Sequence, residues 1–161
     1  MAEVNEQSIV SEILPAEPAD LAIISELVDR SYQTPYKPGG LANRALDTEE
    51  KLEQEIAEGT KILIIKKDGV IVGSNRYRME GDGVCHLTRL AVAPEFRNQG
   101  IGSMLVKKTL AEAKNEGALL ARLECMEEKE LVPYYETFGF QVVEKNPHGK
   151  HTIVTMEKKI D

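Results

Sequence analysis

The sequence predicts an α/β (α+β) protein whose mixed sheet carries helices on its faces. Two glycine-containing turns, Lys67-Asp68-Gly69 and Gly81-Asp82-Gly83, separate three apolar stretches, so we expect an antiparallel meander. An amphipathic helical pattern and a further strand follow the meander, which is the order of a β-α-β unit. A meander joined to a β-α-β unit predicts a sheet with both antiparallel and parallel strand pairs.

The elements before the meander follow from apolar spacing and turn residues. A short strand is expected over residues 10–14, because a proline ends that apolar stretch. A helix is expected from Pro18, since apolar residues then recur at helical spacing. Residues 33–40 are too rich in Pro and Gly for either element and predict a loop. A second helix is expected from Thr48, whose hydroxyl suits an N-cap, to Gly59 at its C-terminal end.

From the meander onward, apolar stretches continue to alternate with turns. The long helix keeps its apolar residues on one face and its charged residues on the other. Asn146-Pro147-His148-Gly149 is rich in residue types that favour turns, so we expect it to join the last two strands as a hairpin. The expected elements are strands at residues 61–66, 70–79, 84–93, 119–125, 140–144 and 151–157 and helices at residues 100–116 and 127–137, the second of which is interrupted or starts near Pro133.

The length of 161 residues indicates a single domain over residues 1–161, large enough to bury a sizeable core. Hydrophobic residues make up 42% of the chain and charged residues 29%, which is ordinary for a soluble globular protein. No stretch approaches the ~20 apolar residues that a membrane helix needs, so we expect no membrane partner. Residues 1–6 are acidic and lack the basic and apolar regions of a signal peptide. We therefore expect a cytoplasmic protein.

The net charge argues against a nucleic-acid partner, and the two cysteines argue against a metal site. The formal net charge is −7, whereas nucleic-acid binding needs clustered Lys and Arg, so we expect no nucleic-acid partner. Cys85 and Cys125 each lie in an apolar strand pattern without the spacing of metal ligands. We expect both to be reduced thiols in the core, and we expect no metal.

The segment Arg97-Asn98-Gln99-Gly100-Ile101-Gly102 lies between an apolar strand and the long helix. Glycines let backbone N–H groups turn inward, and a helix start adds unpaired N–H donors and the positive end of a dipole. Arg97 adds a permanent positive charge at the loop entrance. A strand, a glycine-bearing turn and a helix start therefore predict a site for a phosphate or pyrophosphate.

Three phosphate-binding patterns compete for this loop. A Walker A loop requires Gly, four residues and then Gly-Lys-Ser/Thr, a string that the chain lacks. A dinucleotide fingerprint requires a small residue where the chain has Leu105. The third pattern is Arg/Gln-x-x-Gly-x-Gly/Ala after a strand that ends in apolar-x-Val-x-Pro. The segment from Leu90 to Gly102 matches this third pattern throughout.

Together with a second string downstream, Tyr135-Glu136-Thr137-Phe138-Gly139-Phe140, this match makes the chain resemble the GCN5-related N-acetyltransferase (GNAT) superfamily. The resemblance extends from about Val10 to Lys159 and is strongest between His86 and Phe140. It implies a GNAT-type, mostly antiparallel sheet of about seven strands with helices on both faces. The fourth and fifth of these strands would splay apart, usually at a bulge.

The resemblance also implies acetyl-coenzyme A as the co-substrate. Backbone amides from Asn98 to Ser103 would cradle its pyrophosphate. The N–H and C=O groups at the edge of the fourth strand would pair with the pantetheine arm. The cofactor-binding residues expected from the resemblance are Leu90, Ala91, Val92, Arg97, Asn98, Gln99, Gly100, Ile101, Gly102 and Ser103.

Acetyl transfer to an amine requires loss of a proton from the amine and stabilisation of the departing thiolate. By resemblance, Tyr135 is the general acid that faces the coenzyme sulfur. His86 lies four residues before Leu90, and we expect it to be the base, directly or through a water. Glu80 and Glu124 are alternative bases, and an amine that is already deprotonated would need no protein base.

The expected acceptor is the primary amine of a small molecule. In the superfamily it is selected by segments that correspond here to residues 32–43, with a lid at residues 36–40, and to the hairpin at 146–151. Glu128 stands where many relatives have an Asn, within an acidic stretch that forms either a solvated helix start or an acidic rim. The alternative functions are a non-catalytic acyl-coenzyme-A-binding or regulatory protein, a protein N-acetyltransferase, and transfer of a longer acyl group. Homodimer formation is common in the superfamily and is possible for this chain.

Overall fold

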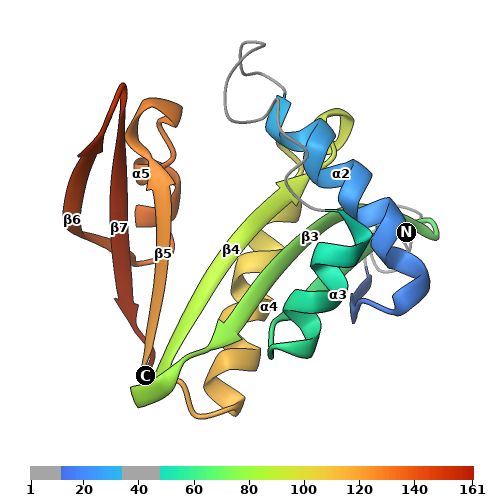
Figure 1. Ribbon diagram of the computed structural model, residues 1–161, viewed down its shortest axis with the longest axis horizontal. Helices are drawn as coiled ribbons and strands as arrows, with labels where there is room; N and C mark the ends of the chain where they lie inside the picture. The colour runs from blue at the N-terminus through green and yellow to red at the C-terminus, as the bar shows by residue number, and fades with distance from the viewer. Residues whose placement is uncertain (1–11, 34–47) are drawn as a thin grey trace, which may run out of the picture. The chain divides into compact units, whose positions relative to one another are not determined.

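The computed structural model describes residues 12–33 and 48–161. Within them a seven-stranded sheet has the strand order β1-β2-β3-β4-β5-β7-β6, and Figure 1 labels β3 to β7 of these strands. The strands are β1 (Glu12–Pro15), β2 (Lys61–Lys67), β3 (Val70–Met79), β4 (Val84–Val92), β5 (Leu120–Met126), β6 (Gln141–His148) and β7 (His151–Lys159). The α-helices are α2 (Leu21–Gln33), α3 (Glu49–Ala57), α4 (Ile101–Asn115) and α5 (Val132–Glu136), and the short 3-10 helices are η1 (Pro18–Asp20), η3 (Gly81–Gly83), η4 (Pro94–Phe96) and η5 (Glu127–Lys129).

The observed sheet confirms the predicted fold class. β4 and β5 pair in parallel, whereas β1 with β2, β5 with β7, and β6 with β7 pair antiparallel. The order of helices and strands along the chain is also the predicted one. The first strand was expected over residues 10–14, of which 10 and 11 lie outside the described residues. No helix in the described part of the chain is long and apolar enough to cross a membrane.

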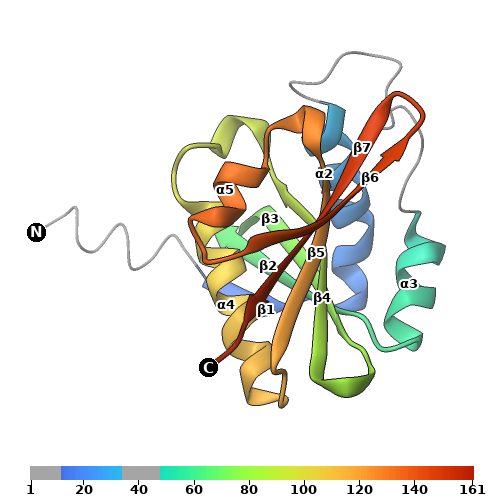
Figure 2. The same cartoon turned by 90° about the vertical axis from the view of Figure 1, so that its left-hand side faces the viewer.

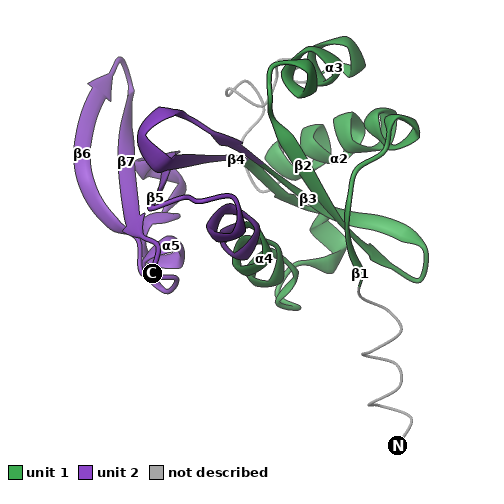
Figure 3. Cartoon of the chain, turned by 90° about the horizontal axis from the view of Figure 1, so that it is seen from below, with its two compact units in different colours: residues 1–76, 89–109 green, residues 77–88, 110–161 purple. Residues whose placement is uncertain are grey.

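The chain divides into two compact units, coloured separately in Figure 3. Unit 1 comprises the described residues within 1–76 and 89–109, and unit 2 comprises residues 77–88 and 110–161. β3, β4 and α4 each begin in one unit and end in the other. The expectation of a single domain over residues 1–161 stays a prediction.

In unit 1, α2 and α3 bury apolar side chains against the sheet. Four consecutive β2 residues, Ile62 to Ile65, are buried, which is typical of a strand covered on both faces. The cluster on the face of α2 and α3 consists of Leu21, Ile24, Leu27, Val28, Leu52, Ile62, Ile64, Ile71, Ala91 and Ala93.

On the other face of β2 and β3 in unit 1, α4 approaches closely at Gly73. A Cβ atom at Gly73 would lie 3.0 Å from side-chain carbons of Ile65 and Leu105 and 3.1 Å from one of Ile101. Because Ile101 is the first residue of α4, this close approach fixes where the helix begins against β3. The absence of a side chain at position 73 therefore positions the loop that precedes α4.

Two predicted helix features are confirmed. Thr48 Oγ1 accepts a hydrogen bond from the Lys51 N–H at 3.1 Å and caps α3. The apolar face of α4 is buried, with Leu105 and Ala113 both 0% exposed. Local spacing was sufficient for these features because a cap and a helical stripe both depend on neighbours within one or two turns.

In unit 2, β5, β7 and β6 lie side by side, and β6 and β7 form a long hairpin (Figure 2). The predicted turn at residues 146–149 was placed too early. β6 continues to His148, which pairs with His151, so Gly149 and Lys150 make the turn. Pro147 is tolerated within β6 because β6 is an edge strand, where a missing N–H needs no partner.

The helix expected at residues 127–137 is interrupted before Pro133, as predicted. Glu130 has a left-handed backbone, with φ 58°, which ends the 3-10 helix η5. α5 then begins at Val132 with a proline in its first turn, as the sequence allowed.

Candidate functional site

The predicted phosphate loop follows β4 directly and leads into α4. η4 covers Pro94–Phe96, and α4 begins at Ile101. Asn98 and Gly100 both have left-handed backbones, with φ of 65° and 80°. Alternation of left-handed and ordinary conformations turns successive N–H groups toward a common concavity, which is a backbone arrangement that binds anions. The backbone of this loop is therefore of a kind that can bind an anion.

Arg97 anchors this loop to the end of α2. Its Nη2 atom donates to the carbonyl oxygen of Ser31 at 2.6 Å and to Ser31 Oγ at 3.3 Å. Ser31 is buried, with 7% exposure, and lies in the last turn of α2. A cation at a helix C-terminus is favoured by the helix dipole. Arg97 thus fixes the loop's entrance in addition to contributing a charge there.

Sequence reasoning missed a second cation beside the loop. Lys67, at the end of β2, donates from Nζ to Gln99 Oε1 at 2.8 Å. The same ammonium lies 5.3 Å from the centre of the Phe96 ring, within cation–π range. Lys67 was interpreted only as part of a hairpin turn, because nothing in the local sequence relates it to a loop 32 residues later.

The expected pantetheine-binding edge lies on the second half of β4, in unit 1. Ala91 is buried, whereas Leu90 and Val92 are half-buried. Arg89, just before them, has a left-handed backbone with φ 53°. A left-handed residue inside a strand interrupts its regular pleat, as a bulge does. The parallel ladder with β5 covers Val84–His86 and ends before this position.

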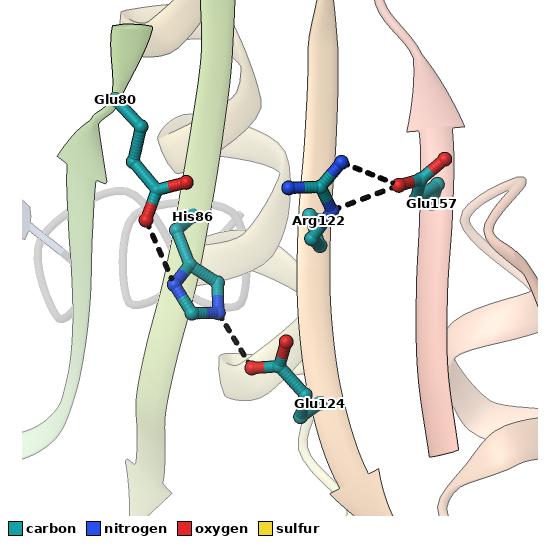
Figure 4. A network of polar contacts seen from close by, with 5 residues as sticks. All are labelled: Glu80, His86, Arg122, Glu124 and Glu157. Carbon is teal, nitrogen blue, oxygen red and sulfur yellow. Dashed lines mark hydrogen bonds and ion pairs between the residues drawn. The ribbon is translucent and has the colours of Figure 1, made fainter. Parts of the chain in front are cut away.

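His86, on the first half of β4, lies between two carboxylates in unit 2 (Figure 4). Its Nε2 atom is 2.6 Å from Glu124 Oε1, and its Nδ1 atom is 3.4 Å from Glu80 Oε2. The side chain of His86 is 25% exposed, that of Glu124 39% and that of Glu80 42%. The two residues that were alternatives to His86 as the base are therefore its immediate partners.

Arg122 completes the polar network drawn in Figure 4. It is the β5 residue paired with His86 in the ladder between β4 and β5. Its Nε atom donates a hydrogen bond to Glu157 Oε2 on β7 at 2.8 Å, and its Nη2 atom lies 2.7 Å from the same oxygen. The positive charge of Arg122 is thereby balanced by Glu157, and Glu124 on the same strand is left to His86.

Tyr135 lies on α5 in unit 2 within a group of aromatic rings. Its ring makes edge contacts with Tyr134, at a centroid distance of 5.3 Å, and with Phe140, at 6.1 Å. Phe140 is buried, as expected of a core residue. Burial raises the pKa of the Tyr134 phenol, so Tyr134 gives up a proton less readily than an exposed tyrosine. The surroundings of Tyr134 therefore suit a packing role.

Comparison with known proteins identifies the family. A family model described as an acetyltransferase (GNAT) domain matches residues 34–160. The chain belongs to the GNAT acetyltransferase family. The match includes the predicted phosphate loop, His86 and Tyr135.

Individual relatives of this GNAT domain match it either over a short segment or at low sequence identity. Serotonin N-acetyltransferase of Mesocricetus auratus is 44% identical over 63 residues, 39% of this chain and 30% of that protein. Glucosamine 6-phosphate N-acetyltransferase of Trypanosoma brucei brucei is 26% identical over 141 residues, 83% of this chain and 91% of that protein. The chain thus spans less than a third of the first relative's length and nearly all of the second's.

Among solved structures, the PaiA N-acetyltransferase of Thermoplasma acidophilum in complex with coenzyme A has the same fold. It superimposes with a TM-score of 0.79 over 92% of this chain and 98% of that one, at 24% sequence identity. At this identity the likeness concerns the fold alone.

The acidic stretch of this GNAT domain makes specific contacts rather than a uniform rim. Glu127 pairs with Lys145 of β6. Glu128 accepts the Thr152 N–H at 3.1 and 3.2 Å and lies 3.6 Å from His151 Nδ1. Hydrogen bonds from backbone N–H groups lower the pKa of the Glu128 carboxyl; the larger effect comes from the N–H of Glu128 itself and the smaller from that of Thr152. Glu128 therefore ties η5 to the start of β7.

The segments expected to select the acceptor lie only partly within the described residues. Of residues 32–43, Tyr32 and Gln33 are described, and the expected lid at 36–40 lies outside the described residues. Tyr32 has the Arg89 guanidinium 5.9 Å from its ring centre. The segment 146–151 forms the tip of the hairpin of β6 and β7.

The candidate residues are thus distributed over both units. All the residues expected to bind the cofactor lie in unit 1, and His86 and Tyr135 lie in unit 2. Among the described residues no group of three or more His, Cys, Asp or Glu is arranged to hold a metal ion. Cys85 and Cys125 are buried free thiols, as predicted.

Proposed function

We propose that this GNAT domain transfers the acetyl group of acetyl-coenzyme A to a primary amine of a small molecule, by direct attack in a ternary complex. The observation that carries the proposal is the loop at residues 97–103. It combines two left-handed residues, a helix start and the Lys67 ammonium, all within the region that the family model matches. The coenzyme A bound to PaiA N-acetyltransferase supports the same cofactor class.

The residues present suit the pyrophosphate of coenzyme A. A Cβ atom at Gly100 would meet nothing within 4 Å, so there is open space beside the loop at this residue. The N–H groups of the first turn of α4 have no carbonyl partner earlier in the helix, and a helix start attracts anions. Lys67 adds a compact positive charge. We propose that Asn98 to Ser103 hold the pyrophosphate and that the edge of β4 at Leu90 to Val92 pairs with the pantetheine arm.

When bound, acetyl-coenzyme A supplies an activated acetyl thioester. A backbone N–H near Leu90 to Val92 would donate to the thioester oxygen as negative charge develops there. His86 would take one proton from the ammonium of the acceptor. The Tyr135 phenol would donate a proton to the departing sulfur and recover one from the acceptor nitrogen, so that only one proton is released overall.

A small cationic amine is the proposed acceptor. Glu80, Glu124 and Glu157 carry three negative charges in the network of Figure 4, against one permanent positive charge on Arg122. An ammonium group would reduce this excess. The two named relatives act on serotonin and on glucosamine 6-phosphate, both small molecules. We also propose that the enzyme has a single domain and is cytoplasmic. We propose no nucleic-acid partner, because a net charge of −7 disfavours binding to a phosphate backbone.

The test is release of coenzyme A thiol from acetyl-coenzyme A over a panel of amines: polyamines, arylalkylamines, amino acids, amino sugars and a peptide with a free N-terminus. We expect release with one small-amine class. Tyr135→Phe should lower turnover roughly 10- to 100-fold while retaining acetyl-coenzyme A binding. Tyr134→Phe, the matched control on the same helix, should keep turnover. Binding without thiol release from any amine would contradict the enzyme and favour a non-catalytic acyl-coenzyme-A-binding protein.

A further inference from the structure

We propose that Glu124 is a positioning residue that holds His86 in the tautomer with its proton on Nε2, so that Nδ1 is the atom that accepts the acceptor's proton. This inference rests on the proposed function, and it adds the atom at which the base acts and the residue that orients it. It concerns only residues of unit 2, from β4 and β5.

The two sides of the His86 ring are not equivalent. The 2.6 Å separation of Nε2 from Glu124 Oε1 is a short hydrogen bond, whereas the 3.4 Å separation of Nδ1 from Glu80 Oε2 is long for one. A carboxylate only accepts, and a neutral imidazole has one N–H and one lone pair. The short contact therefore requires the proton on Nε2, and the lone pair is left on Nδ1.

The neighbouring charges keep Glu124 available for this role. Arg122, two residues before Glu124 on β5, directs its guanidinium away to Glu157 of β7 (Figure 4). Among the described residues, the charged groups that contact the imidazole are Glu80, the residue after β3, and Glu124 of β5, whereas Arg122 is paired with Glu157. An arginine that paired with Glu124 would weaken its hold on Nε2.

Glu80 lies on the side of the ring where the proton would arrive. The Glu80 side chain is 42% exposed and that of His86 is 25% exposed, so both side chains of this contact are partly open to solvent. In the transfer the N–H bond of the ammonium breaks and an Nδ1–H bond forms. The electron pair stays on the acceptor nitrogen, which becomes the nucleophile. The imidazolium keeps its Nε2–H on Glu124, and the added proton later leaves to solvent.

This arrangement follows the general logic of a base oriented by a third group. The orienting carboxylate does not touch the substrate; it selects the tautomer and stabilises the charged ring once the proton has been taken. Loss of Glu124 should therefore change which nitrogen carries the proton. A role in packing alone would not do so.

The test is nitrogen-15 NMR of the imidazole rings in the ligand-free protein, with the His86 signals assigned by their loss in His86→Gln. We expect neutral His86 to show a protonated Nε2 and an unprotonated Nδ1. In Glu124→Gln we expect a mixture of tautomers, and in the control Glu144→Gln, an exposed carboxylate on β6, the wild-type pattern. A protonated Nδ1 in the wild type, or an unchanged tautomer in Glu124→Gln, would overturn the proposal.

Kinetics provide the second readout. Glu124→Gln should lower kcat roughly 10- to 100-fold, part of what a positioned base contributes, with the KM for acetyl-coenzyme A and the unfolding midpoint unchanged. An unchanged kcat would overturn the positioning role. Absence of thiol release by the wild type with every amine would instead overturn the proposed function, while the NMR result would still decide whether Glu124 selects the tautomer.

Discussion

Arg97 Nη2 donates a 2.6 Å hydrogen bond to the carbonyl oxygen of Ser31, 66 residues earlier in the chain. The contact joins the entrance of the proposed phosphate loop to the last turn of α2. Because a buried carbonyl is satisfied by a charged donor, its loss should be felt in stability as well as in binding.

Arg97→Ala should lower the free energy of unfolding by about 1–3 kcal/mol, the range for hydrogen bonds that involve a charged group. It should also weaken acetyl-coenzyme A binding, because the loop loses its anchor. Urea unfolding with parallel calorimetry checks both effects, and Lys107→Ala on the exposed face of α4 is the control. Weaker binding at wild-type stability would mean that Arg97 acts through its charge alone.

Lys67→Gln should weaken acetyl-coenzyme A binding about 2- to 10-fold at low salt, as expected for a half-buried charge near the surface. The ammonium lies 2.8 Å from Gln99 Oε1 within the loop, so it can share its charge with a bound pyrophosphate. Salt screens such contacts, and the difference from wild type should shrink as ionic strength rises. Titrations at several salt concentrations provide the test, with Lys61→Gln at the exposed start of β2 as control. A salt-independent loss would exclude an electrostatic role.

Gly73→Ala should destabilise the protein by about 1–3 kcal/mol, because the new methyl group overpacks three side chains at 3.0–3.1 Å. One of them belongs to Ile101, so the start of α4 should shift and acetyl-coenzyme A should bind more weakly. Gly81→Ala is the matched control, since a Cβ there meets nothing within 4 Å. An equal free energy of unfolding for the two variants would show that α4 moves to accommodate the methyl group without loss of stability.

Burial, together with the nearby carboxylates of Glu116 and Glu80, raises the pKa of the Cys85 thiol from 9.0 to about 12. Between about pH 9 and pH 12 the folded state therefore binds more protons than the unfolded state, and the free energy of unfolding falls as pH rises through this window. Urea unfolding in reductant at pH 7, 8.5 and 10 should show this loss, and Cys85→Ala should reduce the slope. Tyr77, whose pKa is raised in the same direction by burial and Glu116, should leave a residual slope. An identical slope in Cys85→Ala would contradict this explanation.

Local sequence patterns were enough for the strand, loop and helix around Gly100 and for the cap at Thr48, because each depends on neighbouring residues. They were not enough for Lys67 beside Gln99 or Glu124 beside His86, which depend on how strands and loops distant in sequence are placed. The hairpin turn was misplaced because Asn146 and Pro147 are turn formers by type, yet an edge strand tolerates them.

The central claim is that the loop at residues 97–103 binds acetyl-coenzyme A, and calorimetric titration tests it most directly. Gly100 has a φ of 80°, so any side chain there adds strain, and a carboxylate adds repulsion to a pyrophosphate. Gly100→Gln and Gly100→Glu form a matched pair that separates these effects. We predict saturable binding to the wild type, weaker binding to Gly100→Gln and none detectable to Gly100→Glu. No binding to the wild type, or equal binding to all three proteins, would contradict the claim.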